Sequence, residues 1–136
     1  MAGELTLPVQ ECPDIVCQYV AVVLQSDADG NVSNNQTVFY CEQDTVVDAA
    51  FLRFALGDDT ATWTLERATD GTAVASGVDM SDAVTHATAL NNKVSTFTII
   101  ETANLVPAGS AITLKCTGTS TAKLGTLTLR IRTRVR

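Results

Sequence analysis

The sequence has few of the side chains on which most catalytic sites depend. Its 136 residues include one histidine, one tryptophan, two tyrosines and four phenylalanines. Only 18% of the residues are charged, whereas 46% are hydrophobic. The scarcity of histidine removes most candidates for a base-assisted nucleophile, and the hydrophobic content excludes intrinsic disorder. We therefore expect one packed core of ordinary domain size, and we expect that the protein is not an enzyme.

Basic residues are few and unevenly placed. The formal charge of the chain is −6, but residues 130–136 contain four arginines and no acid, so the charge divides into +4 for this segment and −10 for the rest. A nucleic-acid-binding protein needs a basic face that neutralises phosphates. An acidic body of this size repels a polyanion over most of its surface, so we expect no nucleic-acid partner.

Long hydrophobic runs are also absent. The longest extends from Val20 to Leu24, far below the roughly 20 residues that a bilayer-spanning helix needs, and the first ten residues lack the basic start of a signal peptide. We expect no membrane partner and synthesis in a reducing cytoplasm. The four cysteines, Cys12, Cys17, Cys41 and Cys116, are then most simply buried thiols, although a disulfide between the first two stays open.

The residues that are abundant favour strands. Threonine occurs 20 times and alanine 17 times, and hydrophobic residues alternate with polar ones at the period of a strand. The pattern predicts an all-β, antiparallel β-sandwich, jelly-roll-like, of about eight strands. Residues 15–136 form its single domain, and residues 1–14, with two prolines, form an extended N-terminal arm. The predicted strands are 15–24, 37–41, 45–56, 60–67, 72–78, 93–100, 111–117 and 125–135.

Several local details follow from the same patterns. The strand 15–24 is apolar on both faces, which indicates burial on both or contact with a neighbour. In the strand 60–67, alternation places Trp63 in the core with Ala61 and Leu65. Asp70-Gly71 predicts a tight hairpin between this strand and the next, and the segment 81–90 could form a short helical turn.

Candidate chemical sites are weak. Asp27, Asp29 and Asn31 begin like a calcium loop, but valine occupies the positions that need glycine and glutamate, so we expect no metal. No glycine-rich phosphate loop is present, and we expect no cofactor. Asp58, Asp59 and Glu66 are expected to be solvated surface carboxylates, and His86 an incidental surface or half-buried histidine.

The C-terminal strand has the most distinctive pattern. Arg130, Arg132, Arg134 and Arg136 share one face at the period of a strand. Like charges in one row are destabilising unless acid lies opposite. Two interpretations stay open: the arginines protect a sheet edge from unwanted pairing, or they form an ionic interface with another subunit.

Three segments together resemble a known class of small β-sandwich. They are Trp63–Gly77, Phe97–Leu114 with its Pro-Ala-Gly-Ser turn, and Gly125–Ile131. The resemblance is to virion proteins of tailed bacteriophages, of the head decoration or cement type, and it covers residues 45–136. The four cysteines and the basic C-terminus depart from that type, so the mode of attachment stays open.

The resemblance implies a structural role without enzymatic activity. Such proteins are typically trimers or dimers on the outer capsid surface, so the implied partners are the major capsid protein and further copies of the chain, as a homotrimer or a dimer. The implied location is the virion, after synthesis in the host cytoplasm. The arm, with Leu5, Leu7 and Val9 as alternate anchors, would add a strand to the shell protein, and Arg130–Arg136 would contact acid on the shell or a sister subunit.

A second function is compatible with the same sandwich. The chain could be a fibre-base or adhesion module that binds a receptor or a sugar. Sugar sites usually stack the ring on exposed aromatic side chains, and the seven aromatic residues lie mostly at positions expected in the core. An exposed Trp63 in a groove would favour this alternative.

Overall fold

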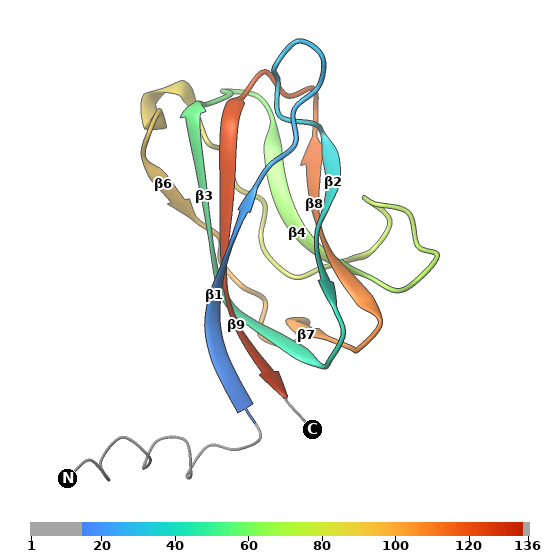
Figure 1. Cartoon of the computed structure of the whole chain (residues 1–136). Helices are drawn as coiled ribbons and strands as arrows, with labels where there is room; N and C mark the ends of the chain where they lie inside the picture. Colours follow the sequence, from blue (N-terminus) through green and yellow to red (C-terminus); the bar gives the residue numbers. More distant parts are fainter. Residues whose placement is uncertain (1–14, 135–136) are drawn as a thin grey trace, which may run out of the picture.

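The computed structural model describes residues 15–134 and consists almost entirely of strands (Figure 1). Its one short helix in this range is the 3-10 turn η2 (Thr88–Leu90). The strands are β1 (Ile15–Val23), β2 (Asn35–Cys41), β3 (Thr45–Leu56), β4 (Thr62–Ala68), β5 (Val78–Asp79), β6 (Val94–Thr96), β7 (Leu105–Val106), β8 (Ser110–Thr117) and β9 (Lys123–Arg134).

The strands form two antiparallel sheets that face each other (Figure 1). One sheet has the order β1-β9-β3-β6, with β7 also paired to β3, and the other has the order β2-β8-β4-β5. Strands adjacent in sequence thus mostly alternate between the sheets, and the first strand pairs with the last, as in a jelly roll. The predicted all-β antiparallel sandwich is confirmed. The predicted arm, residues 1–14, lies outside the described residues.

The core lies between the two sheets and follows the predicted alternation. Ala61, Trp63 and Leu65 are fully buried, as the sequence predicted. The ring of Phe54, from β3, lies 5.2 Å from the Trp63 ring and 5.2 Å from the His86 ring, centroid to centroid. Edge-to-face and tilted aromatic contacts of this kind add to the stability that burial itself provides. Trp63 is therefore a core residue and offers no platform for a sugar.

A bulge in β3 reverses which residues of the strand face the core. Val47 pairs with Ile131 and Ala49 with Arg130, so Asp48 is the extra residue. Odd-numbered positions are buried before the bulge and even-numbered positions after it, from Val47 to Ala50. Because a bulge shifts the side-chain alternation by one, both Asp48 and Ala49 face outward from the sheet.

Two local predictions are wrong. Asp70-Gly71 does form a turn, with Gly71 at φ +86°, but no tight hairpin follows, because β4 pairs only with the two-residue β5 after an irregular loop at 69–77. The predicted helical turn at 81–90 is reduced to η2. The rest of this segment is held by isolated bridges, Trp63 to Val84 and Ser81 to Ile99, whose partners lie far away in the sequence.

For the first strand, burial of both faces is contradicted, whereas the alternative that was expected with it, contact with a neighbour, stays a prediction. Within residues 15–134, β1 lies at the end of its sheet and pairs only with β9. Cys17, Tyr19, Ala21 and Val23 are exposed, and Val20 is half-buried. The apolar character of both strand faces therefore does not reflect burial within this chain.

Candidate interaction surface

The arginine row lies on an interior strand of its sheet, which excludes one of the two interpretations. β9 is paired on both sides, with β1 and with β3, so the arginines do not protect a sheet edge. Arg130 and Arg132 are exposed on the outer face of the sheet. Arg134 ends β9, but its side chain is not described, and Arg136 lies outside the described residues, as do Leu5, Leu7 and Val9.

Arg132 is partnered within the chain. Its Nε donates to Asp48 Oδ2 at 2.7 Å and its Nη2 donates to Asp48 Oδ1 at 3.0 Å, across the β3 bulge. This forked geometry suits a guanidinium and a carboxylate, and the hydrogen bond followed by the charge of Asp48 raises the pKa of Arg132. The pair lies at the surface, so it contributes little to stability. Arg130 makes no ion pair with the described residues.

Around Arg130, the outer face of the sheet β1-β9-β3-β6 exposes large hydrophobic side chains. The register places Arg130 beside Tyr19 on β1 and Ala49 on β3. The exposed hydrophobic residues of this face are Tyr19 (65%), Val23 (82%), Val94 (56%) and Leu105 (46%). A surface that combines exposed hydrophobic side chains with a cation that has no ion pair among the described residues is typical of a protein contact. We call this surface the outer face.

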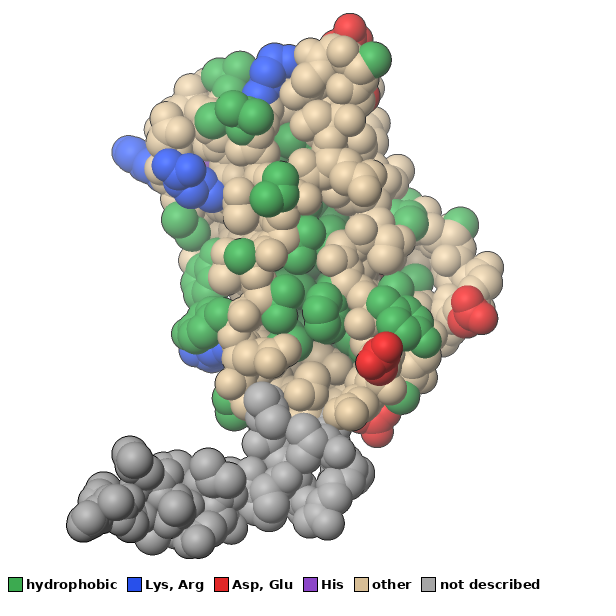
Figure 2. Space-filling model, in the orientation of Figure 1, with side chains coloured by type: hydrophobic (Ala, Val, Ile, Leu, Met, Phe, Trp, Pro, Cys, Tyr) green, Lys and Arg blue, Asp and Glu red, His purple; other side chains and the backbone are tan. Residues whose placement is uncertain are grey.

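A second exposed feature, the β1 edge, lies beside the outer face. We use this name for the side of Ile15–Val23 that does not pair with β9. Beside the edge lies a strip between β1 and β2 in which Val20, Val38 and Phe39 are only partly buried against the core. Figure 2 shows hydrophobic and uncharged side chains along this strip. The sandwich is thus incompletely closed on the side where β1 and β2 are the edge strands.

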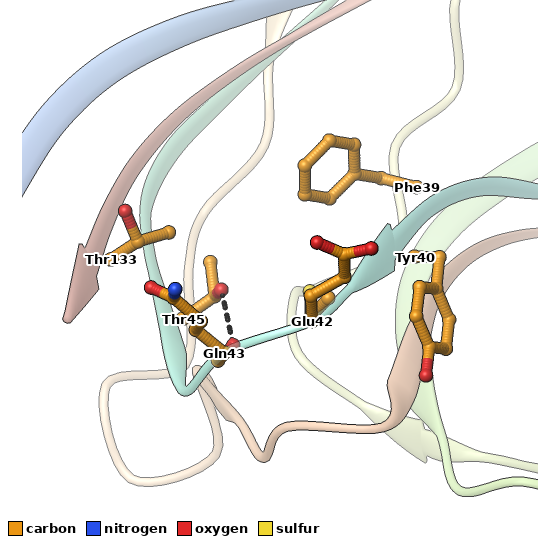
Figure 3. A pocket seen from close by; sticks show the side chains of 7 residues that line it. Phe39, Tyr40, Glu42, Gln43, Thr45 and Thr133 are labelled. Carbon is orange, nitrogen blue, oxygen red and sulfur yellow. Dashed lines mark hydrogen bonds between the residues drawn. The ribbon is translucent and has the colours of Figure 1, made fainter. Parts of the chain in front are cut away.

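A shallow hollow of about 340 Å³ lies at one end of this strip (Figure 3). It lies at the end of β2, where the chain turns into β3, and Thr133 of β9 lines its other side. Glu42 and Phe39 lie above the turn, and the Thr45 hydroxyl donates to the Gln43 carbonyl at 2.8 Å. The hollow is large enough to receive a side chain of a partner.

The acids and the histidine weighed as catalytic candidates are structural, and the expectation of surface exposure was wrong for three of them. Asp58 is 3% exposed, Glu66 1% and His86 0%. His86 Nδ1 shares a hydrogen bond with the Ser95 hydroxyl at 2.8 Å, and its Nε2 lies 2.9 Å from the Leu90 carbonyl. Burial lowers the pKa of His86, and the Leu90 hydrogen bond only partly opposes this.

Asp58 accepts hydrogen bonds that hold two loops at the start of β4. Its Oδ1 accepts hydrogen bonds from the amides of Thr60 and Ala61, and its Oδ2 accepts from the amide and hydroxyl of Thr121. Burial by itself would raise the pKa of Asp58, but the hydrogen bonds outweigh it and lower the pKa. Asp59, whose carboxylate accepts from Thr88, also serves the local fold.

Glu66 is buried on the face of β4 that was expected to be polar and solvated. Its Oε2 lies 3.1 Å from Lys115 Nζ, which also donates to Asp79 at 2.9 Å. The hydrogen bond to Asp79, and next that to Glu66, raise the pKa of Lys115. Glu66 Oε1 and the hydroxyl of its cross-strand neighbour Thr113 have no partner among the described residues.

The cysteines divide into two kinds. Cys41 and Cys116 are buried free thiols, as predicted, whereas Cys17 is an exposed free thiol on β1, which is a correction. Burial raises the pKa of Cys116 to about 11, with a smaller contribution from Asp58, and burial also raises that of Cys41. Cys12 lies outside the described residues.

Other kinds of site find little support in the part of the chain that the structure describes. No group of three or more His, Cys, Asp or Glu side chains is placed to hold a metal ion among residues 15–134. In the same range, no helix has the length and hydrophobicity needed to cross a bilayer.

Comparison with known proteins shows the fold. No family model and no curated protein matches the sequence. A solved structure described as "Bacillus endospore appendages form a novel family of disulfide-linked pili" is similar over 90% of this chain and 90% of that chain, at 18% identity and a TM-score of 0.52. A chain of the cyanophage Pam1 capsid asymmetric unit is similar over 90% of this chain and 85% of that one, at 17% identity and a TM-score of 0.49.

Proposed function

We propose that this chain is a structural subunit of a large protein assembly, and that the assembly is the head of a tailed bacteriophage. In this proposal it is a decoration protein that binds the lattice of the major capsid protein from outside and stabilises the head. The observation that carries the proposal is the outer face, which exposes Tyr19 beside Arg130, a cation without an ion pair among the described residues, and Val94 on the far strand β6. Exposed hydrophobic side chains of this kind stabilise a lasting protein contact, whereas in an isolated sandwich they remain in contact with water.

The physical role follows from mass action. A protein that binds only the assembled shell stabilises it by its binding free energy, because each contact is lost when the shell comes apart. The outer face supplies apolar area, and Arg130 supplies a cation whose pairing with acid on the shell would guide the encounter. The arm, with Leu5, Leu7 and Val9, would add main-chain hydrogen bonds.

The likeness to the appendage structure supports only the fold, because 18% identity does not transfer a role. Of the aromatic residues, Tyr19 on the outer face is exposed, but its surroundings are explained by a protein contact without a sugar. Trp63, whose exposure would have favoured sugar binding, is fully buried.

The test is a binding experiment with phage heads. The purified full chain is mixed with expanded heads that lack a decoration protein, taken from the phage that carries this protein, and bound protein is separated by sedimentation. We expect saturable binding and heads that resist higher temperatures. Arg130→Glu should weaken binding and reduce its salt dependence, whereas Val78→Glu, which adds an acid at an exposed site of the other sheet, should not. Absence of binding to expanded heads would contradict the proposal.

A further inference from the structure

The edge strands of the sandwich are protected from unwanted pairing in all but one case. β5 has two residues, β6 has three, and β2 is interrupted by a register shift between Thr37 and Phe39. Short strands and bulges of this kind prevent a further strand from joining a sheet. β1 is different: it pairs with β9 over nine residues without a register shift, and it contains no charged residue, glycine or proline. It offers an open row of amides and carbonyls on its free side.

We propose that the β1 edge pairs antiparallel with the β1 edge of a second copy of this chain, across a twofold axis at Tyr19. The two sheets then become one continuous sheet, in the strand order β6-β3-β9-β1 followed by the same order reversed. This goes beyond shell binding, because it assigns the edge to a sister copy and leaves the outer face free for the shell.

The register is fixed by side-chain alternation. Directly opposite residues in an antiparallel pair must point to the same side of the sheet, so the axis passes through a residue and not between two. Tyr19 is the middle residue of Ile15–Val23, and only an axis at this residue pairs the whole strand. Cys17 then lies opposite Ala21 of the second copy, and Tyr19 lies opposite its own equivalent.

Charge does not oppose this pairing. β1 is uncharged, and the nearest cations are Arg130 and Arg132 on β9, opposite Tyr19 and Cys17. Across the joined sheet the central row reads Arg130, Tyr19, then Tyr19 and Arg130 of the second copy. Three strand spacings separate the two arginines by about 14 Å, beyond the screening length of about 10 Å at moderate salt. The tyrosine pair fills the space between them.

The partly buried strip beside β1 gives a second reason for this partner. Val20 points to the inner side of the sheet and is only partly covered, as are Val38 and Phe39 on the β2 side. A second β1 extends the sheet over this strip, so the second copy's Val20 and Val22 cover Val38 and Phe39. The strand of the second copy thus forms hydrogen bonds with the free amides and carbonyls of β1 and also buries hydrophobic area that this chain leaves exposed.

The inference deepens the proposed function by naming one of its partners, but its test needs no phage head. A contact of this kind is self-complementary and closes at two copies. It therefore selects the dimer from the two oligomeric states expected from the sequence. A dimer that does not bind heads would contradict the proposed function but not the β1 pairing. A monomer that binds heads would contradict only the β1 pairing.

The first test measures the mass of the full chain in solution under reducing conditions. We expect a concentration-dependent equilibrium between 14.4 kDa and twice that mass. Tyr19→Lys places two cations directly opposite each other and removes an aromatic pair, so it should weaken dimerisation at least about tenfold. Val94→Lys, at an exposed site of the same face on the far strand β6, should leave it unchanged. A monomer at all concentrations, a trimer, or a dimer unaffected by Tyr19→Lys would overturn the proposal.

The second test reads the register directly by disulfide formation. Opposite residues in an antiparallel pair are close enough for a disulfide. In a Cys12→Ser background, Ala21→Cys should cross-link two copies on mild oxidation, through Cys17 of the other copy. Adding Cys17→Ser should abolish this cross-link, whereas Tyr19→Cys combined with Cys17→Ser should restore it through the symmetric pair. Equal cross-linking in all three variants would exclude a defined β1 pairing.

Discussion

Removal of the Asp58 carboxylate is the substitution that the described contacts predict to be most damaging among the acidic residues. Asp58→Ala deletes an acceptor for the amides of Thr60, Ala61 and Thr121. Ala61 is fully buried, so its amide loses its partner without access to water, at a cost of about 1–3 kcal/mol. Thr60 and Thr121 are exposed, so their amides can form hydrogen bonds with water in the variant. The loss of their charge-assisted bonds to Asp58 therefore adds less to the loss of stability. The expected loss is about 3 kcal/mol, or roughly 10 °C in the melting temperature.

The assay is chemical and thermal unfolding followed by circular dichroism, with Asp59→Ala as the matched control. Asp59 is an exposed neighbour whose bonds to Thr88 lie at the surface, so its loss should cost below about 1 kcal/mol. Because the pKa of Asp58 is lowered in the folded protein, its contribution is complete above the unfolded value near 3.9 and declines as the pH falls below it. Equal losses for the two variants, or no acid-dependent difference between wild type and Asp58→Ala, would refute the reasoning.

Three further predictions concern single groups. The pKa of His86 is lowered in the folded protein, so the unfolded chain binds a proton more readily than the folded one. The free energy of unfolding should therefore fall as the pH drops below about 6.5. In His86→Gln, denaturant unfolding measured over the same pH range should no longer show this fall. In a Cys12→Ser background, a thiol reagent at pH 8 should modify exposed Cys17 rapidly and buried Cys41 and Cys116 only on unfolding; equal rates would contradict the burial. Arg132→Ala should change the stability measured by urea unfolding only slightly, because an exposed ion pair contributes little; a large loss of stability would contradict the surface position of the pair with Asp48.

The strands were predictable where one face is buried and the other is polar. β3 has the predicted ends, and β4 buries Trp63 as its alternation indicates. Local pattern suffices in these strands because each strand's own side chains decide which face meets the core. The β3 bulge was not predictable in this way, because it depends on pairing with β9, more than 80 residues later in the chain.

The candidate surface was only partly predictable. Apolar residues on both faces of β1 indicated either burial or contact with a neighbour, because hydrophobicity alone does not distinguish a core strand from an exposed strand that binds a partner. The arginine row was correctly singled out, but the place of β9 inside its sheet is set by long-range pairing with β1 and β3. No local signal identifies β1 as an edge strand, because it lacks the charge, proline and glycine with which edge strands are usually protected.

The burial of Asp58 and Glu66 was not predicted, for a related reason. Asp58 accepts hydrogen bonds from Thr121, 63 positions away, and one carboxylate oxygen of Glu66 pairs with Lys115 on β8. From sequence alone a carboxylate is expected at the surface. Only the tertiary arrangement shows which hydrogen-bond donors lie close to it in the interior.

The most direct measurement of the central claim is an electron cryomicroscopy map of the phage particle that carries this protein. The account predicts the sandwich on the outer surface of the head, with the outer face turned toward the major capsid protein and β1 paired with β1 of a neighbouring copy. Density for the sandwich inside the head or at the tail, or on the head with Tyr19 and Arg130 turned to solvent, would contradict it.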